Sequence, residues 1–189
     1  MKKYELLVDD TITFFGVQLF RIKALISFSG VEKGEVGGYV ASESNLSQSG
    51  DAWVYGDARV YGNAEVYGDA RVYGNAEVYG NARVYGNAEV SGNARVSGNA
   101  EVSGNAEVYG DARVYGNADY IVFKNTWSSG RYFTYTKSNK NWRVGCFYGS
   151  GAELVEKAYK DSKKSGDFYK AYVDFVEKLE EIENIHKEQ

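Results

Sequence analysis

The chain has 189 residues, a formal net charge of −4, 22 glycines, 17 tyrosines, one cysteine and no proline. The small net charge argues against a general nucleic-acid binder or an acidic mimic of DNA, and one cysteine excludes an intrachain disulfide. No segment has the apolar run of a signal peptide or a membrane span, so we expect a cytoplasmic protein in a reducing compartment.

Residues 1–49 precede a regular repeat and carry strand-like apolar runs on both sides of Gly16. Irregular Gly-rich words then lead into the repeat. A stack of short parallel strands leaves unpaired edges at its ends, and such edges need a cover. We therefore expect this region to form an N-terminal β cap.

From Gly50 to Ile121 the chain repeats a six-residue word twelve times. Each word except the last holds Ala-x-Val, which places Ala and Val on one face of a short strand and the middle residue on the other. A Gly-Asn or Gly-Asp pair follows, and these residues tolerate the left-handed backbone of a corner. We therefore expect each word to form one very short strand and one corner of a coil that stacks on itself.

The middle residues of the words indicate how many words make one coil. They alternate between Arg and Glu, so a coil of two words would stack like charges, whereas a coil of three stacks opposite charges, each pair contributing about 0.2–1 kcal/mol. The predicted stacks are Arg59–Glu77–Arg95, Glu65–Arg83–Glu101 and Arg71–Glu89. Three consecutive words end in Ser in place of Tyr, which fits one full belt around a coil: Ser91, Ser97 and Ser103.

The alternation breaks where the Glu101 word is followed by the Glu107 word. Beyond this point, a coil of three words places like charges above each other. Solvent screening is the only factor suggested by the sequence that would reduce this repulsion. The predicted like-charge pairs are Glu89–Glu107, Arg95–Arg113 and Glu101–Asp119. Four triangular coils would result, each rising about 4.8 Å. Their interior would hold Ala52 to Ala118 and Val54 to Val114, with Tyr120 in place of the last Val.

The segment RIKALISFSGVEKGEVGGYVASESNLSQSGDAWVYGDARV resembles the N-terminal region of bacterial YdcK-type hexapeptide-repeat proteins, and similar proteins occur in phages and prophages. The shared features are an aliphatic-rich strand, a Gly-Gly-aromatic-Val step and Leu-Ser-Gln before the first Gly-Asp word. The resemblance covers about the first 120 residues. It implies a mainly β fold with a left-handed parallel β-helix, whereas the general crossover rule would favour a right-handed one. It implies no secure activity, although acyltransferases share the helix.

The stretch from Tyr120 to Ser150 has five basic residues, no acidic residue and interleaved aromatic rings. We predict three strands with a hairpin near Ser138-Asn139. These basic and aromatic residues can form the core of a sheet with solvated charges, or they can bind a partner. A protein partner is favoured over nucleic acid. The candidate partner-binding residues are Trp127, Arg131, Tyr132, Tyr135, Lys137, Lys140, Trp142 and Arg143.

Two helices are predicted after this stretch. Ser150 and Glu153 have the spacing of a capping box, and a second helix runs from about Gly166 to His186. The division is then a β cap at 1–49, a repeat at 50–121 and an α+β unit at 122–189. The apolar residues of the second helix follow the 4, 3, 4, 3 spacing of an a/d seam, which is a candidate site of oligomer formation: Phe168, Tyr172, Phe175, Leu179 and Ile182.

No catalytic or metal-binding constellation emerges from the sequence, and it indicates no cofactor. Hexapeptide acyltransferases use a histidine beside a loop that leaves the coil, but the one histidine here is His186, at an a/d position near the C-terminus. Cys146 precedes a helix start, where a thiol can be activated, but its apolar neighbours favour a buried small residue. Corner formation explains the repeated Asp and Asn without calcium. The outward tyrosines after each inward Val can form ladders, an interface or both.

We therefore expect a non-enzymatic binding or inhibitory protein, in which a rigid β-helix presents a C-terminal unit that binds a macromolecule. The resemblance to phage proteins suggests a role in counter-defence inside a bacterial host cell. Two alternatives stay open. One is an acyltransferase-like enzyme with a site at a subunit interface, and the other is a self-assembling structural rod or homo-oligomer.

Overall fold

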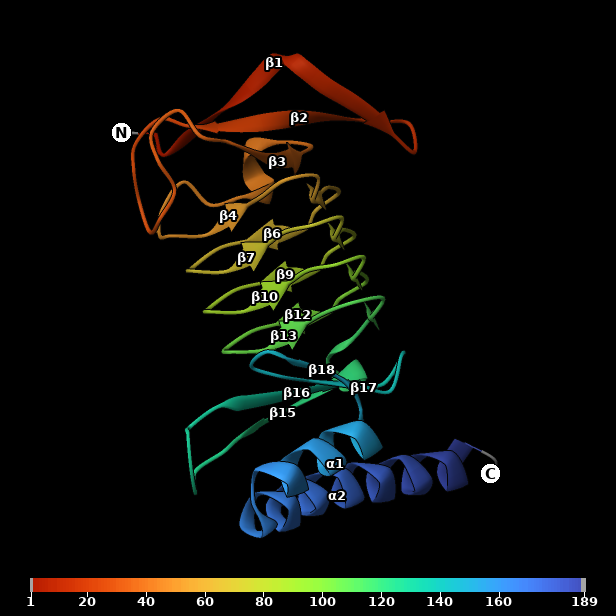
Figure 1. Ribbon diagram of the computed structural model, residues 1–189. Helices are drawn as coiled ribbons and strands as arrows, with labels where there is room; N and C mark the ends of the chain where they lie inside the picture. The colour runs from red at the N-terminus through yellow and green to blue at the C-terminus, as the bar shows by residue number, and fades with distance from the viewer. Residues whose placement is uncertain (1, 188–189) are drawn as a thin grey trace.

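The computed structural model describes residues 2–187, which form three parts along one axis (Figure 1). A β cap lies at one end, a β-solenoid of about four turns forms the middle, and a four-stranded sheet with two helices lies at the other end. The predicted mainly β fold, with its repeat solenoid and its α+β end, is confirmed. The left-handed sense of the coil stays a prediction.

The repeat words form eleven strands of two residues each, joined by Gly-Asn and Gly-Asp corners. Gly86 shows why the corner needs glycine: its φ is 69°, and a Cβ there would lie 3.0 Å from the Gly104 nitrogen of the next coil. The strands are β4 (Trp53–Val54), β5 (Arg59–Val60), β6 (Glu65–Val66), β7 (Arg71–Val72), β8 (Glu77–Val78), β9 (Arg83–Val84), β10 (Glu89–Val90), β11 (Arg95–Val96), β12 (Glu101–Val102), β13 (Glu107–Val108) and β14 (Arg113–Val114).

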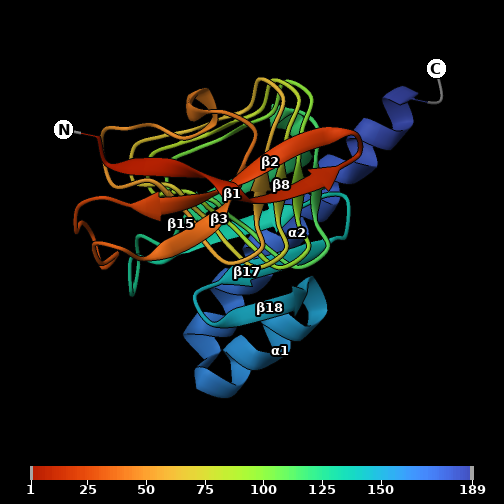
Figure 2. The same ribbon diagram turned by 90° about the horizontal axis from the view of Figure 1, so that it is seen from above.

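Strands three words apart pair in parallel and form the three faces of the solenoid, which Figure 2 shows from the N-terminal end. The orders are β5-β8-β11-β14, β4-β7-β10-β13 and β6-β9-β12. Val78 pairs with Val60 and with Val96, each 18 residues away, which confirms the predicted coil of three words. The inward Ala and Val side chains from Ala52 to Val114 are at most 1% exposed.

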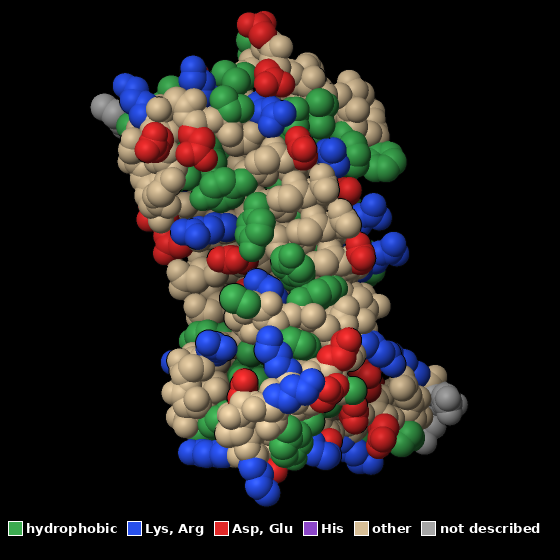
Figure 3. All heavy atoms as spheres, viewed as in Figure 1, with side chains coloured by type: hydrophobic (Ala, Val, Ile, Leu, Met, Phe, Trp, Pro, Cys, Tyr) green, Lys and Arg blue, Asp and Glu red, His purple; other side chains and the backbone are tan. Residues whose placement is uncertain are grey.

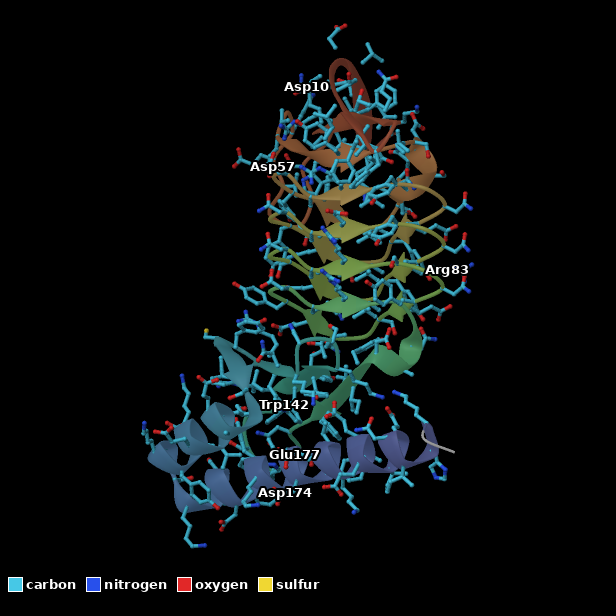
Figure 4. The ribbon with its side chains drawn as sticks, turned by 90° about the vertical axis from the view of Figure 1, so that its right-hand side faces the viewer. Asp10, Asp57, Arg83, Trp142, Asp174 and Glu177 are labelled. Atoms are coloured by element: carbon cyan, nitrogen blue, oxygen red, sulfur yellow. The ribbon has the colours of Figure 1, made fainter. Side chains whose placement is uncertain are left out.

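Arg and Glu of the predicted charge ladder lie in register along the coils, and three of the five predicted pairs lie within 4.0 Å of each other. Arg83 lies between Glu65 and Glu101, at 3.8 and 3.5 Å, and projects from the side of the stack in Figure 4. Arg95 lies 3.7 Å from Glu77. Most of these side chains are about half exposed, so each pair contributes up to about 1 kcal/mol and is weakened by salt.

Outward tyrosines stack between neighbouring coils. The nearly parallel ring pairs are Tyr61–Tyr79, with centroids 5.1 Å apart, and Tyr67–Tyr85, with centroids 4.9 Å apart. In the coil that carries the Ser belt, Ser91 and Ser97 are 1% and 3% exposed. Ser103, the third member of the belt, is partly exposed.

The twelfth word does not form a strand of the solenoid, so its predicted place in the coil is wrong. Asn117–Asp119 form a short 3-10 helix, η2, in which Asp119 Oδ2 accepts a hydrogen bond from the Tyr115 N–H at 2.7 Å. Ala118 is therefore exposed rather than inside. The expected pair of Glu101 with Asp119 gives way to a hydrogen bond from the Glu101 N–H to the Asn117 side chain. A local carboxylate cap thus ends the coil.

The predicted N-terminal cap is present. Strands β1 (Tyr4–Phe14) and β2 (Val17–Ala24) form an antiparallel hairpin across the first coil, and β3 (Val36–Val40) joins β2 to β5 (Figures 1 and 2). The register of β1 shifts between Leu7 and Thr11. This irregularity interrupts the outer edge of the sheet and makes it a poor template for further strands.

The cap supplies hydrogen-bond donors to the first coil. Along the stack, carbonyls such as that of Ala76 accept an N–H of the preceding coil, here that of Arg59, so the equivalent carbonyls of the first coil need donors from elsewhere. Each face receives at least one donor: Lys3 Nζ donates to the Ala52 carbonyl (2.8 Å), the Tyr39 N–H to Ala58 (2.9 Å) and Asn45 Nδ2 to Ala64 (2.8 Å). Asn45 ends the 3-10 helix η1 (Glu43–Asn45).

The C-terminal unit contains four antiparallel strands rather than the predicted three, because Phe147–Ser150 forms a strand of its own. The strands are β15 (Tyr120–Lys124), β16 (Tyr132–Thr136), β17 (Asn141–Val144) and β18 (Phe147–Ser150). The turn at 137–140 confirms the predicted hairpin. Helix α1 (Gly151–Asp161) begins with the predicted capping box of Ser150 and Glu153, and α2 (Lys163–Lys187) packs with it against the sheet. In the described chain no helix is both long and apolar enough to span a membrane.

Candidate functional site

Three hydrogen-bond acceptors close the last coil, and two of them belong to the C-terminal unit. The last coil has N–H groups without a following coil to receive them, and one side-chain oxygen serves each face. Asn117 Oδ1 accepts from the Glu101 N–H (2.7 Å), Thr134 Oγ1 from Glu107 (2.9 Å) and Ser138 Oγ from Arg113 (2.7 Å). Thr134 lies in β16 and Ser138 in the turn after it, so the sheet itself closes the solenoid.

An ion pair between Arg143 of β17 and Glu107 of β13 strengthens this junction. Arg143 Nε donates to Glu107 Oε2 at 2.8 Å, and the guanidinium lies 4.6 Å from the ring centroid of Tyr109. Glu107 pairs in register with Glu89, whose carboxylate accepts a hydrogen bond from the Tyr73 hydroxyl. Each of these like charges thus has its own donor. The break in the Arg/Glu alternation places an anion where the C-terminal unit docks.

Two of the eight predicted partner-binding residues are core residues. Tyr135 and Trp142 are 4% and 2% exposed, and Figure 4 shows Trp142 inside the C-terminal unit. The Tyr135 hydroxyl donates to Glu180 of α2, and burial, followed by this carboxylate, raises the pKa of Tyr135. A partner cannot reach these rings, because α2 covers this face of the sheet.

Other predicted residues are engaged by α2. Lys137 pairs with Glu183 at 2.5 Å, and Lys140 lies 3.8 Å from Glu180. Trp127 stacks on the ring of Phe168, with centroids 4.3 Å apart. The basic and aromatic stretch therefore forms a sheet whose charges are balanced from the second helix. Figure 3 accordingly shows positive and negative side chains close together on the C-terminal unit.

Arg131 and Tyr132 remain accessible and lie beside an open cleft. Arg131 and Gly145 line both of its hollows. The first, of about 210 Å³, enters between the β17–β18 turn and α1. The second, of about 540 Å³, lies against the last coils of the solenoid. We call this site the Arg131 cleft. Its polar and charged residues include Arg131, Tyr132, Cys146, Lys157 and Asp161, with Asn87, Glu89, Asn105 and Glu107 on the solenoid side.

The first hollow combines positive charge with apolar walls. Within residues 2–187, neither Arg131 nor Lys157 forms an ion pair, and the ammonium of Lys157 lies 5.9 Å from the ring centroid of Phe147. Burial raises the pKa of Tyr169, whose hydroxyl lies near enough to Arg131 for that charge to oppose the shift. The arrangement can hold a carboxylate beside an apolar side chain.

Cys146 lies in this cleft and is exposed, so the expected burial is wrong. Gly145, with a φ of 56°, and Cys146 form the two-residue turn between β17 and β18. A residue at the tip of such a turn faces solvent whatever its hydrophobicity. The Val-Gly-Cys-Phe sequence carries this turn signal in its glycine. Lys157 also went unnoticed from sequence, although its spacing from Asp161 puts both side chains on one side of α1.

The predicted oligomer seam lies on one side of α2. Three of its members are large exposed apolar residues: Phe168 (40% exposed), Phe175 (52%) and Ile182 (43%). Tyr172 and Leu179 are partly buried. The most deeply buried residues of α2, Val173 and Val176, lie on a neighbouring face.

His186 is exposed in the last turn of α2 and lines a groove with Tyr115 and Ile182. Within the described residues, no group of three or more His, Cys, Asp or Glu side chains is arranged to hold a metal ion. The side chains of the corner asparagines instead form hydrogen bonds to each other along the stack. Asn63 donates to Asn81 in the next coil, and Asn81 donates to Asn99 in the coil after it.

Comparison with known families supports the repeat assignment. The YdcK beta solenoid repeat matches residues 52–68, 76–91 and 88–104. All three matches lie in the regular coils, where the words pair 18 residues apart. A comparison with curated proteins finds no match.

Proposed function

The middle of this chain is a YdcK-type β-solenoid, and from this premise we propose that the protein is a non-enzymatic binding protein that holds a segment of a protein partner in the Arg131 cleft. It acts stoichiometrically in the cytoplasm of a bacterial cell. Similar repeats in phages make an inhibitor of a host protein the most specific form of this proposal.

The observation that carries the proposal is the pair of free cations, Arg131 and Lys157, beside an apolar hollow at a rigid junction. Three side-chain acceptors and the Arg143–Glu107 pair hold the junction. A preformed cleft costs little ordering entropy when a partner binds. An acidic residue next to an apolar residue in an extended segment would match its chemistry.

The same contacts disfavour single-stranded nucleic acid as the ligand. Base stacking needs accessible rings along a positive groove. Here Tyr135 and Trp142 are buried, and Lys137 and Lys140 face the carboxylates of α2. The asparagines of the solenoid side, Asn87 among them, suit hydrogen bonding to a peptide backbone.

The test is affinity capture from bacterial lysate with and without nuclease, followed by binding measurements on the purified partner. We expect a protein that survives nuclease and binds in a one-to-one ratio. The double variant Arg131→Glu with Lys157→Glu should weaken binding at least about tenfold, because it reverses both free charges. Lys160→Glu is the matched control on the same helix, since Lys160 pairs with Glu156 and does not line the cleft.

Two results would contradict the proposal. One is binding that the double variant leaves unchanged while its fold, checked by circular dichroism, is intact. The other is capture that depends wholly on nucleic acid.

A further inference from the structure

Helix α2 carries an exposed apolar stripe that is separate from the Arg131 cleft. The stripe consists of Phe168, Phe175, Ile182 and Ile185, which are 40%, 52%, 43% and 56% exposed. The first three follow each other at intervals of seven residues, and half-buried Tyr172 and Leu179 lie between them. We call these six residues the α2 stripe. Exposed apolar residues in such a continuous row indicate an interaction surface.

The rings of the α2 stripe are held in place by the sheet. Phe168 stacks on Trp127, and Phe175 meets the edge of Phe123 with ring centroids 6.1 Å apart. Tyr172 also packs on Phe123, at 5.2 Å. These contacts fix the orientation of the rings, so a partner that covers them loses little side-chain entropy on their account.

The stripe continues into a groove at the C-terminal end of α2. This groove has a volume of about 560 Å³ and is lined by Ile182 and His186 of α2 and by Tyr115 and Arg113 of the last coil. Tyr115 is itself 52% exposed. The groove can accept a large aromatic side chain that projects from a helix lying along the stripe.

The apolar and charged residues of α2 match those of a second α2 that runs in the opposite direction. Phe168 and Ile182 lie seven residues on either side of Phe175. The first half of the helix, up to Asp174, has three lysines and two aspartates, whereas the second half has four glutamates and two lysines. An antiparallel pair places the more basic half of each helix against the more acidic half of the other, and a parallel pair places the glutamates together.

We propose that the α2 stripe binds the α2 stripe of a second copy of the chain, antiparallel and centred on Phe175. Phe175 then packs on Phe175 of the second copy. Phe168 of the second copy lies opposite Ile182 and fills the groove beside Tyr115. Lys164 lies opposite His186 of the second copy on both sides of the two-fold axis. This interface goes beyond the proposed function, because it leaves the Arg131 cleft free.

The first experiment measures the mass of the full chain by analytical ultracentrifugation over a range of concentrations. We expect a dimer, with a dissociation constant raised about a hundredfold or more in the variant Phe175→Lys with Ile182→Lys. Phe15→Lys is the matched control: Phe15 is 85% exposed but lies at the opposite end of the molecule, in the β1–β2 turn. A monomeric wild-type chain at about 100 µM would overturn the proposal, as would equal loss of dimer in the control.

The second experiment determines the direction of the helices by disulfide formation in a Cys146→Ser background. Lys164 and His186 are exposed and lie eleven residues on either side of Phe175. Two single variants, Lys164→Cys and His186→Cys, should cross-link rapidly when mixed and slowly alone. Rapid self-linking of either variant alone would contradict the antiparallel arrangement. Partner binding at the Arg131 cleft should persist in the Phe175→Lys with Ile182→Lys variant, so the two proposals fail separately.

Discussion

The two ends of the solenoid are closed by different sets of hydrogen-bonding groups. At the N-terminal end the β cap presents donors: an ammonium, a backbone N–H and a side-chain amide reach the carbonyls before β4, β5 and β6. At the C-terminal end one amide and two hydroxyl oxygens accept from N–H groups of the last coil, and the Tyr120 hydroxyl donates to the Glu101 carbonyl. Parallel strands have a direction, so the backbone groups left unpaired at the two ends of the stack differ. The difference shows that each cap is specific for its own end.

An arginine over a tyrosine ring occurs at both ends, but with different electrostatic partners. Arg21 of the N-terminal cap lies 4.2 Å from the ring centroid of Tyr39 and donates to the Gly56 carbonyl. Its carboxylates, Asp10 and Asp57, are looser, at 3.4 and 3.9 Å, and both are labelled near that end in Figure 4. Arg143 instead has a direct hydrogen bond to a carboxylate of the coil itself. The C-terminal junction thus depends more on one ion pair.

The largest effect should come from removing a buried donor of the N-terminal cap. Asn45 is fully buried, and its amide donates to the carbonyls of Gly62 and Ala64 at 3.1 and 2.8 Å. Asn45→Leu keeps the volume but leaves both carbonyls without that donor. We expect the free energy of unfolding to fall by about 2–4 kcal/mol, measured by urea denaturation.

The control for this prediction is another asparagine whose hydrogen bond is exposed. Asn63→Leu breaks the bond from Asn63 to Asn81 at a solenoid corner and should cost less than about 0.5 kcal/mol. Equal losses in the two variants would show that closing the first coil is not what makes Asn45 important.

A smaller effect should follow from restoring the charge alternation at the other end. Glu107→Arg would place an arginine beside Glu89, as the ladder alone would favour, but it would also face Arg143. We expect a loss of about 1–2 kcal/mol, because the pair with Arg143 is largely shielded from solvent. The reciprocal Arg143→Glu in the same chain should recover most of the loss in a double-mutant cycle. A more stable single variant would mean that the ladder outweighs the junction.

The smallest effect concerns the pH dependence of the N-terminal cap. Burial, opposed by the charge of Asp51, lowers the pKa of Lys3 to about 8 from an ordinary value of 10.5. Above about pH 8 the folded chain therefore releases this proton while the unfolded chain still holds it, so stability should rise with pH up to about 10. Lys3→Met should lack this rise.

The measurement is thermal unfolding of both chains between about pH 7 and pH 9.5. The upper limit matters because burial raises the pKa of Tyr4 and Tyr61, and such tyrosines lower stability once unfolded tyrosine ionises near pH 10. Parallel curves for the two chains would contradict the assigned role of Lys3.

The solenoid was predictable because its information is local and repeated. The alternation of Arg and Glu with the Ser belt was enough to determine three words per coil, and the pairing of Arg59 with Glu77 confirms it. The end of the coil was not predictable from the word itself. Its twelfth copy keeps Gly-Asn-Ala, and the difference depends on the Asp119 carboxylate that folds back to the Tyr115 N–H.

The candidate site was predictable only in part, since most of its charged and polar side chains pair with residues that are distant in the sequence. Lys137 and Tyr135 find their carboxylates in α2, 46 and 45 residues later, and Arg143 finds Glu107 36 residues earlier. A local excess of basic and aromatic residues therefore suggested an open binding surface, whereas two of the eight residues lie in a core and four others contact α2 or the solenoid. Arg131 stayed accessible, but no feature of its own sequence neighbourhood distinguished it.

The charge ladder also restricts the lengths that such a solenoid can have. Geometry allows growth by whole coils, that is, by three words and about 4.8 Å at a time. The signs of the middle residues, however, repeat every two words. If one coil of three words were added and the alternation kept, every middle residue beyond the insertion would need the opposite charge. Only a step of two coils, about 10 Å, would return Glu107 to Arg143 with the same neighbours. The charge ladder thus allows the distance between the two ends of the molecule to change only in steps twice as long as the backbone geometry requires.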